Sequence, residues 1–108
     1  MGPGPYHPGR ELERAVERGD LRLAVAIAKD ITRESGRPIP LALARRLLPL
    51  VAVERPDAYD AWACRWLARW LSEAHEATID GAADLAAALA DLPSEPVSAQ
   101  DTIKRLGG

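Results

Sequence analysis

The chain has 108 residues, a length that suits one domain, and its 47% hydrophobic and 28% charged residues argue against global disorder. Its net charge of −2 gives no field strong enough to gather nucleic acid, and its single cysteine excludes an internal disulfide. No stretch approaches the ~20 apolar residues of a membrane span and no signal peptide is visible, so we expect a soluble, cytoplasmic protein. The apolar residues are mostly Ala and Leu, without Phe, and this composition favours helix over strand.

The first nine residues hold three Gly and three Pro, which predicts a flexible arm. A helix is expected over residues 10–18, closed by Gly19 in the left-handed conformation. A second helix is expected to begin after the N-cap Asp20 and to end before Gly36. Apolar residues recur at helical spacing along its inner face, which consists of Leu23, Ala24, Ile27, Ala28 and Ile31.

A third helix is expected over residues 40–54, because Pro40 suits a first helical turn. Leu, Ala and Val wrap most of the way round it and leave only Arg45 and Arg46 as a narrow polar edge. A helix this apolar is expected in the middle of a bundle. Pro49 removes one backbone donor inside the helix, so we expect a kink or a split there.

The strongest amphipathic pattern lies over residues 56–75. Its broad apolar stripe consists of Tyr59, Trp62, Ala63, Trp66, Leu67, Trp70, Leu71 and Ala74. A fifth helix is expected over residues 79–92 with Thr78 as its cap, and a last short one over residues 99–106 with Ser98 as its cap.

No segment has a strand pattern, and the short loops should pack successive helices antiparallel. The sequence therefore predicts an all-α fold, namely a five- or six-helix bundle of antiparallel helical hairpins. We expect residues 1–9 to form the arm and residues 10–108 to form a single helical domain. The tetratricopeptide pattern leaves most later positions unmatched when it is started at Trp62 or Trp66, and we find no internal repeat.

Three tryptophans, Trp62, Trp66 and Trp70, recur every four residues in the 56–75 pattern. They are consistent with a core, where large indoles fill the grooves that Ala leaves, and with an exposed aromatic ridge that binds a partner. A mixed case is also open, because each indole N–H needs an acceptor and Trp is rarely buried completely. Arg65 and Arg69 flank the indoles, where they could stack on them, bind an anion or stay solvated. These five residues are the candidate partner-binding set.

Catalytic and metal-binding constellations are missing from the sequence. A nucleophilic Cys64 would need a nearby base, but His7 lies in the arm and His75 lies eleven residues further along the same helix, about 16 Å away. One Cys and two His, scattered in this way, do not supply the converging ligands of a zinc site. We therefore expect no enzymatic activity, no cofactor and no metal.

A DNA-binding interpretation would take the helices on either side of residues 35–38 as a helix-turn-helix. The second helix should then offer polar side chains to base edges, whereas residues 41–44 are Leu and Ala. The pattern therefore disfavours nucleic acid as a partner. A regulatory DNA-associated or small-ligand-sensing domain, using Arg37, Arg45 and Arg46 or a pocket beside the indoles, is the alternative hypothesis.

One stretch, residues 55–71, contains an Arg-Trp-Leu-Ala-Arg helix at residues 65–69, and an Ala/Leu-rich segment over residues 82–93 ends in Leu-Pro. In these features the central and C-terminal half of the chain resembles uncharacterised small Ala/Leu/Arg-rich all-helical proteins of actinobacterial type. That group has no known activity. The resemblance therefore implies an all-helical fold and transfers no functional residue.

The apolar helix over residues 40–54 and the aromatic stripe over residues 56–75 together offer more apolar surface than a chain of this length readily buries, and such surplus marks interfaces. We therefore predict a non-enzymatic helical protein–protein interaction module that binds another protein or itself. A homodimer is its simplest form. We expect no membrane partner.

Overall fold

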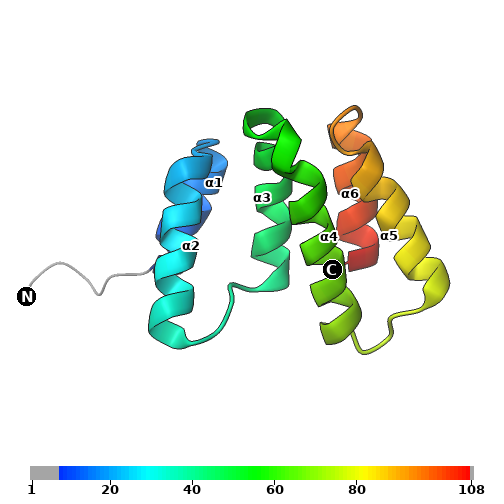
Figure 1. Ribbon diagram of the computed structural model, residues 1–108, viewed down its shortest axis with the longest axis horizontal. Helices are drawn as coiled ribbons and strands as arrows, with labels where there is room; N and C mark the ends of the chain where they lie inside the picture. The colour runs from blue at the N-terminus through cyan, green and yellow to red at the C-terminus, as the bar shows by residue number, and fades with distance from the viewer. Residues whose placement is uncertain (1–7, 108) are drawn as a thin grey trace, which may run out of the picture. The chain divides into compact units, whose positions relative to one another are not determined.

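The computed structural model describes residues 8–107, and over that range it contains six α-helices, one 3-10 turn and no strand (Figure 1). The predicted all-α fold of antiparallel helical hairpins is confirmed. The chain divides between residues 40 and 41 into two compact units, each with its own packed helices. The single domain expected over residues 10–108 stays a prediction.

The first unit is a helical hairpin in which α1 (Pro8–Glu17) packs against α2 (Leu21–Ser35). α1 ends at Glu17 and is closed as predicted by Gly19, whose φ of 71° is in the left-handed region. The Gly19 N–H donates to the Val16 carbonyl at 3.0 Å and the Asp20 N–H donates to the Ala15 carbonyl at 2.9 Å. These two bonds form a Schellman motif, which turns the chain directly into α2.

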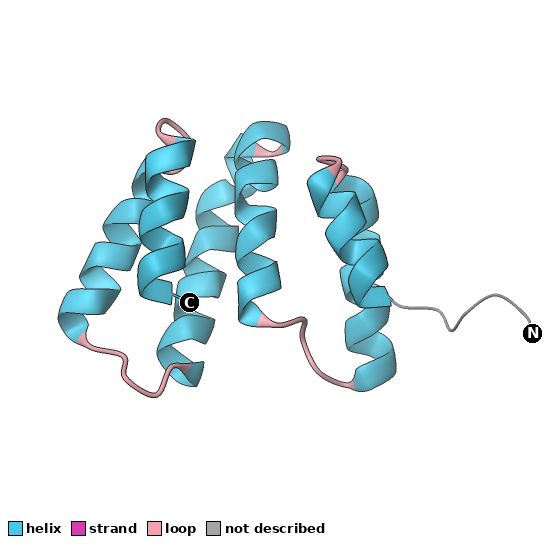
Figure 2. Ribbon diagram, turned by 180° about the vertical axis from the view of Figure 1, so that it is seen from behind, coloured by secondary structure: helices cyan, strands magenta, loops and turns pink. Residues whose placement is uncertain are grey.

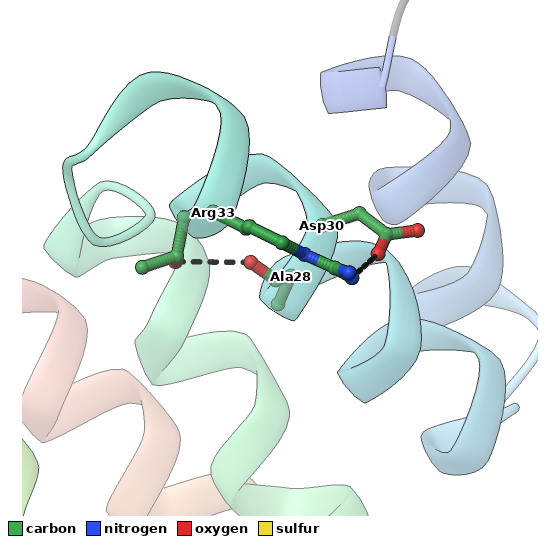
Figure 3. A network of polar contacts seen from close by, with 4 residues as sticks. Ala28, Asp30 and Arg33 are labelled. Carbon is green, nitrogen blue, oxygen red and sulfur yellow. Dashed lines mark hydrogen bonds and ion pairs between the residues drawn. The ribbon is translucent and has the colours of Figure 1, made fainter.

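Both ends of α2 follow the sequence prediction. The Asp20 carboxylate accepts from the Leu23 N–H at 3.1 Å, and Gly36, with φ 71°, donates its N–H to the Thr32 carbonyl at 2.9 Å. Arg33 forms an ion pair with Asp30 on the surface of this helix (Figure 3). The buried apolar side chains of this unit are those of Leu12, Ala15, Val16, Ala24, Ile27 and Ile39.

The second unit consists of two further hairpins (Figure 2). Its elements are α3 (Leu41–Glu54), the 3-10 turn η1 (Pro56–Ala58), α4 (Tyr59–Glu73), α5 (Ile79–Asp91) and α6 (Pro96–Gly107). α4 packs against both α3 and α5, and α5 packs against α6. α4, which has the aromatic stripe, is therefore the central helix of this unit.

α3 is one unbroken helix, so the split considered at Pro49 does not occur. It buries Leu47, Leu48 and Val51, while its other apolar side chains are half-buried or, like that of Val53, exposed. The expected central position therefore holds for one face of α3 only, because its one packed helical neighbour within the described part of this unit is α4.

Proline accounts for two of the helix starts that differ from the sequence prediction; a third differs because residues 56–58, expected as the first turn of the fourth helix, form the 3-10 turn η1 before α4. α1 begins at Pro8 rather than residue 10, and α6 begins at Pro96 rather than residue 99. A proline at the first helical position loses no hydrogen bond, because that N–H has no partner within the helix in any case. Ser98 consequently lies inside the first turn of α6 and is not its cap.

Candidate functional site

Two of the three tryptophans belong to the core of the second unit. The side chains of Trp66 and Trp70 are 3% and 7% exposed. The Trp66 Nε1 donates to the Leu41 carbonyl at 2.9 Å, which joins α4 to the start of α3. A Cβ on Gly107 would lie 2.7 Å from the Trp66 Cη2, and one on Gly81 would lie 3.6 Å from the Trp70 Cη2. The two indoles thus fill space against α3, α5 and α6.

Tyr59 is also buried, and its hydroxyl completes the end of a different helix. The hydroxyl donates to the Leu89 carbonyl of α5 at 2.5 Å. In a regular helix that carbonyl would accept from the N–H four residues on, but Pro93 occupies that position and has no N–H. Burial, with a smaller contribution from Asp60, raises the pKa of Tyr59 to about 12.

Trp62 differs from its two neighbours because its indole is only half-buried. The guanidinium carbon of the exposed Arg65 lies 5.7 Å from the centroid of the Trp62 ring, within cation–π range. The sequence is compatible with both core and interface positions for these indoles. The structure places Trp66 and Trp70 in the core and leaves Trp62, with its stacked arginine, accessible.

Arg69 lies one turn after Arg65 and is partly exposed, with its Nε 2.9 Å from the Glu73 Oε2. Trp62, Arg65, Arg69 and Glu73 recur at three- and four-residue intervals, so they line one flank of α4. Trp62, Arg65 and Arg69 are the accessible members of the predicted partner-binding set of five, and this flank brings the three together. We call it the Trp62 flank.

The residues considered for catalysis and metal binding do not converge. Cys64 and His75 are both exposed, and His7 lies outside the described residues. Over residues 8–107, no three His, Cys, Asp or Glu side chains are placed to hold a metal ion.

The arginines named in the alternative hypothesis differ in their exposure to solvent. Arg37 is exposed between α2 and α3, whereas Arg45 and Arg46 are half-buried on α3. The buried Nε of Arg45 has no hydrogen-bond partner among the described residues. Burial, and then the neighbouring positive charge of Arg46, lowers the pKa of Arg45. A DNA-associated or ligand-sensing role stays a prediction.

A groove of about 330 Å³, which the sequence does not predict, lies between α5 and α6. Its floor includes the buried Ala88 and Ala99. Its exposed rim includes the carboxylates of Asp84, Asp91 and Glu95 together with the guanidinium of Arg105. The small alanines at facing positions on the two helices were the available sequence signal, but only the packing shows that they leave a hollow.

No protein-family model, curated protein or solved structure matches this chain. The resemblance to small actinobacterial helical proteins therefore stays a prediction. Among the described residues, no helix has the length and apolar character needed to cross a membrane.

Proposed function

We propose that this protein is a non-enzymatic helical interaction module that binds a partner protein through the Trp62 flank. The observation that carries the proposal is the partly exposed Trp62 beneath the Arg65 guanidinium. Trp and Arg are the residues most enriched among those that dominate the binding energy of protein interfaces. An indole held against a core helix also loses little conformational freedom on binding.

The surroundings of this pair support the same function. Trp66 and Trp70 anchor α4 on three neighbouring helices, so the flank is presented by a rigid element. Arg69 extends the cationic surface by one turn and already has an anionic neighbour in Glu73. A partner of matching chemistry would cover the indole with an apolar side chain and offer a carboxylate to the arginines.

The test compares capture by three forms of the intact chain from a lysate of the source organism. These are the unchanged protein, the double variant Trp62→Ala/Arg65→Ala and the control Cys64→Ala, which changes an exposed residue on the same helix. We expect at least one protein to be retained by the unchanged chain and the control and to be lost with the double variant. The captured protein should then bind the purified chain directly, with affinity at least about tenfold weaker for the double variant.

Circular dichroism of all three forms checks that α4 remains folded. If every retained protein binds the double variant as strongly as the unchanged chain, the Trp62 flank is not the binding surface and the proposal is wrong.

A further inference from the structure

Two eight-residue segments of the chain have the same pattern of apolar residues and opposite charges at their ends. On α2 the segment is Arg22-Leu-Ala-Val-Ala-Ile-Ala-Lys29, and on α5 it is Asp84-Leu-Ala-Ala-Ala-Leu-Ala-Asp91. We call them the basic octad and the acidic octad. In each, the terminal charges are seven residues apart, which is two helical turns and about 10.5 Å along the axis. The two pairs of charges are therefore equally spaced and on one face of each helix.

The structure leaves all four end charges in solvent. Arg22, Lys29, Asp84 and Asp91 are exposed, and none of them takes part in an ion pair within the described part of the chain. Between the cations lie the half-buried Val25 and the exposed Ala26.

The acidic octad forms one wall of the α5–α6 groove. Asp84 and Asp91 stand on its rim, and between them Ala87 and Ala88 leave room for side chains of an incoming helix. Glu95 adds a third carboxylate against the single guanidinium of Arg105, so the rim is negative. Residues 70–103 contain seven Asp or Glu and no Lys or Arg, so α5 itself has no cation that could neutralise Asp84 and Asp91.

Two of the end charges oppose the preference of their own helix. Arg22 is in the first turn of α2, where the helix dipole favours an anion, and Asp91 is the last residue of α5, where it favours a cation. Helix stability alone therefore does not account for either charge. A contact between the octads would account for both.

We propose that the α5–α6 groove binds α2 of a second copy of this chain, with Arg22 and Lys29 of one copy opposite Asp84 and Asp91 of the other. This inference rests on the proposed interaction function and assigns one further surface to self-association, separate from the Trp62 flank. Every copy has both octads. Two copies can therefore form a closed pair, in which the α2 of each lies in the groove of the other, or successive copies can associate head to tail. Charge complementarity at matched spacing fixes the register, and the alanines allow close approach.

Charge reversal tests the pairing directly. The groove variant is Asp84→Lys/Asp91→Lys, and the α2 variant is Arg22→Glu/Lys29→Glu. Sedimentation velocity over concentrations up to about 1 mM measures the solution mass of each. We expect the mass of the unchanged chain to rise with concentration, and each variant alone to associate at least about tenfold more weakly, because like charges then face each other. An equimolar mixture of the two variants has complementary charges at both contacts and should regain the association of the unchanged chain.

Matched controls separate a local contact from the effect of net charge. Asp80→Lys/Asp101→Lys changes the charge as much as the groove variant does, at exposed acidic positions outside the groove. Arg10→Glu/Arg37→Glu does the same for the α2 variant within the first unit. We expect both controls to associate within about twofold of the unchanged chain, since well-separated surface charges are screened.

A monomeric mass for the unchanged chain at every concentration would overturn the inference. So would a mixture of the two variants that associates no better than either alone, or controls that weaken association as much as the variants do. None of these results touches the Trp62 flank, whose test is the loss of partner capture in Trp62→Ala/Arg65→Ala. The two proposals can therefore fail independently.

Discussion

The hydrogen bond from Tyr59 to Leu89 predicts a specific loss of stability in Tyr59→Phe. The substitution removes one oxygen from a site that is 2% exposed and leaves the ring in place. The Leu89 carbonyl then keeps only a 3.4 Å contact from the Leu92 N–H, because Pro93 offers no donor. A buried acceptor left in this state costs ~1–3 kcal/mol. We expect the free energy of unfolding in urea to fall by that amount at neutral pH.

The raised pKa of Tyr59, caused by burial and then by Asp60, predicts how stability depends on alkaline pH. The pKa of Tyr59 is about 12 in the folded protein, against an ordinary value of 10.0, so between these values the unfolded chain loses this proton first. The contribution of Tyr59 to stability is therefore constant below pH 10 and falls as the pH rises towards 12, by up to ~2–3 kcal/mol at 1.36 kcal/mol for each pKa unit. The difference in stability between the unchanged chain and Tyr59→Phe should shrink over this interval. Absorbance at the tyrosinate band measures the titration itself.

A double-mutant cycle with Pro93→Ala identifies the reason for the bond. Alanine at this position restores an N–H four residues after Leu89, so the carbonyl no longer depends on the Tyr59 hydroxyl. Tyr59→Phe should then cost less in the Pro93→Ala background, by at least about 0.5 kcal/mol. An equal cost in both backgrounds would refute the reasoning that Tyr59 replaces the missing donor.

Three further substitutions test the packing of Trp66, the exposure of Trp62 and the N-cap of α2. Gly107→Ala should lower the free energy of unfolding by ~1–3 kcal/mol, because its Cβ would lie 2.7 Å from the Trp66 ring. The control Gly9→Ala should not lower it, because no atom lies within 4 Å of its Cβ, and equal effects of the two substitutions in urea unfolding would contradict this. Trp62→Phe should remove most of the iodide-quenchable fluorescence, since the other two indoles are buried, and an unchanged quenchable fraction would show that another indole is accessible. Asp20→Ala should lower thermal stability by ~0.5–2 kcal/mol through loss of the α2 N-cap, and a calorimetric change near zero would show that the cap is dispensable.

The helices of this protein could be predicted because their signals are local. Asp20, Gly36 and Thr78 act at the helix ends where the sequence placed them, since caps depend on hydrogen bonds within a few residues. Pro8 and Pro96 were misinterpreted for an equally local reason. A proline in an N-terminal arm, or one that follows a helix, is also compatible with the first turn of the next helix, and the sequence alone does not separate these cases.

The candidate site could be predicted only as a set of residues. Four-residue spacing turns successive tryptophans by about 40° round a helix, so Trp62 and Trp70 lie about 80° apart with Trp66 between them. Which edge of that arc is exposed depends on where the neighbouring helices pack, and this is a tertiary property. For the same reason the two octads are visible in the sequence, whereas the exposure of their end charges and the groove beside Asp84 are not.

The long interval without lysine or arginine has a practical consequence for probing this protein. Trypsin cleaves after basic residues, so after Arg69 its next target is Lys104, and α5 lies wholly between them. Limited digestion with trypsin will therefore report local opening of α1 to α4 and register nothing from α5. A protease that cleaves at Asp or Glu would sample that helix, and protection of those sites at high protein concentration would show that association covers it.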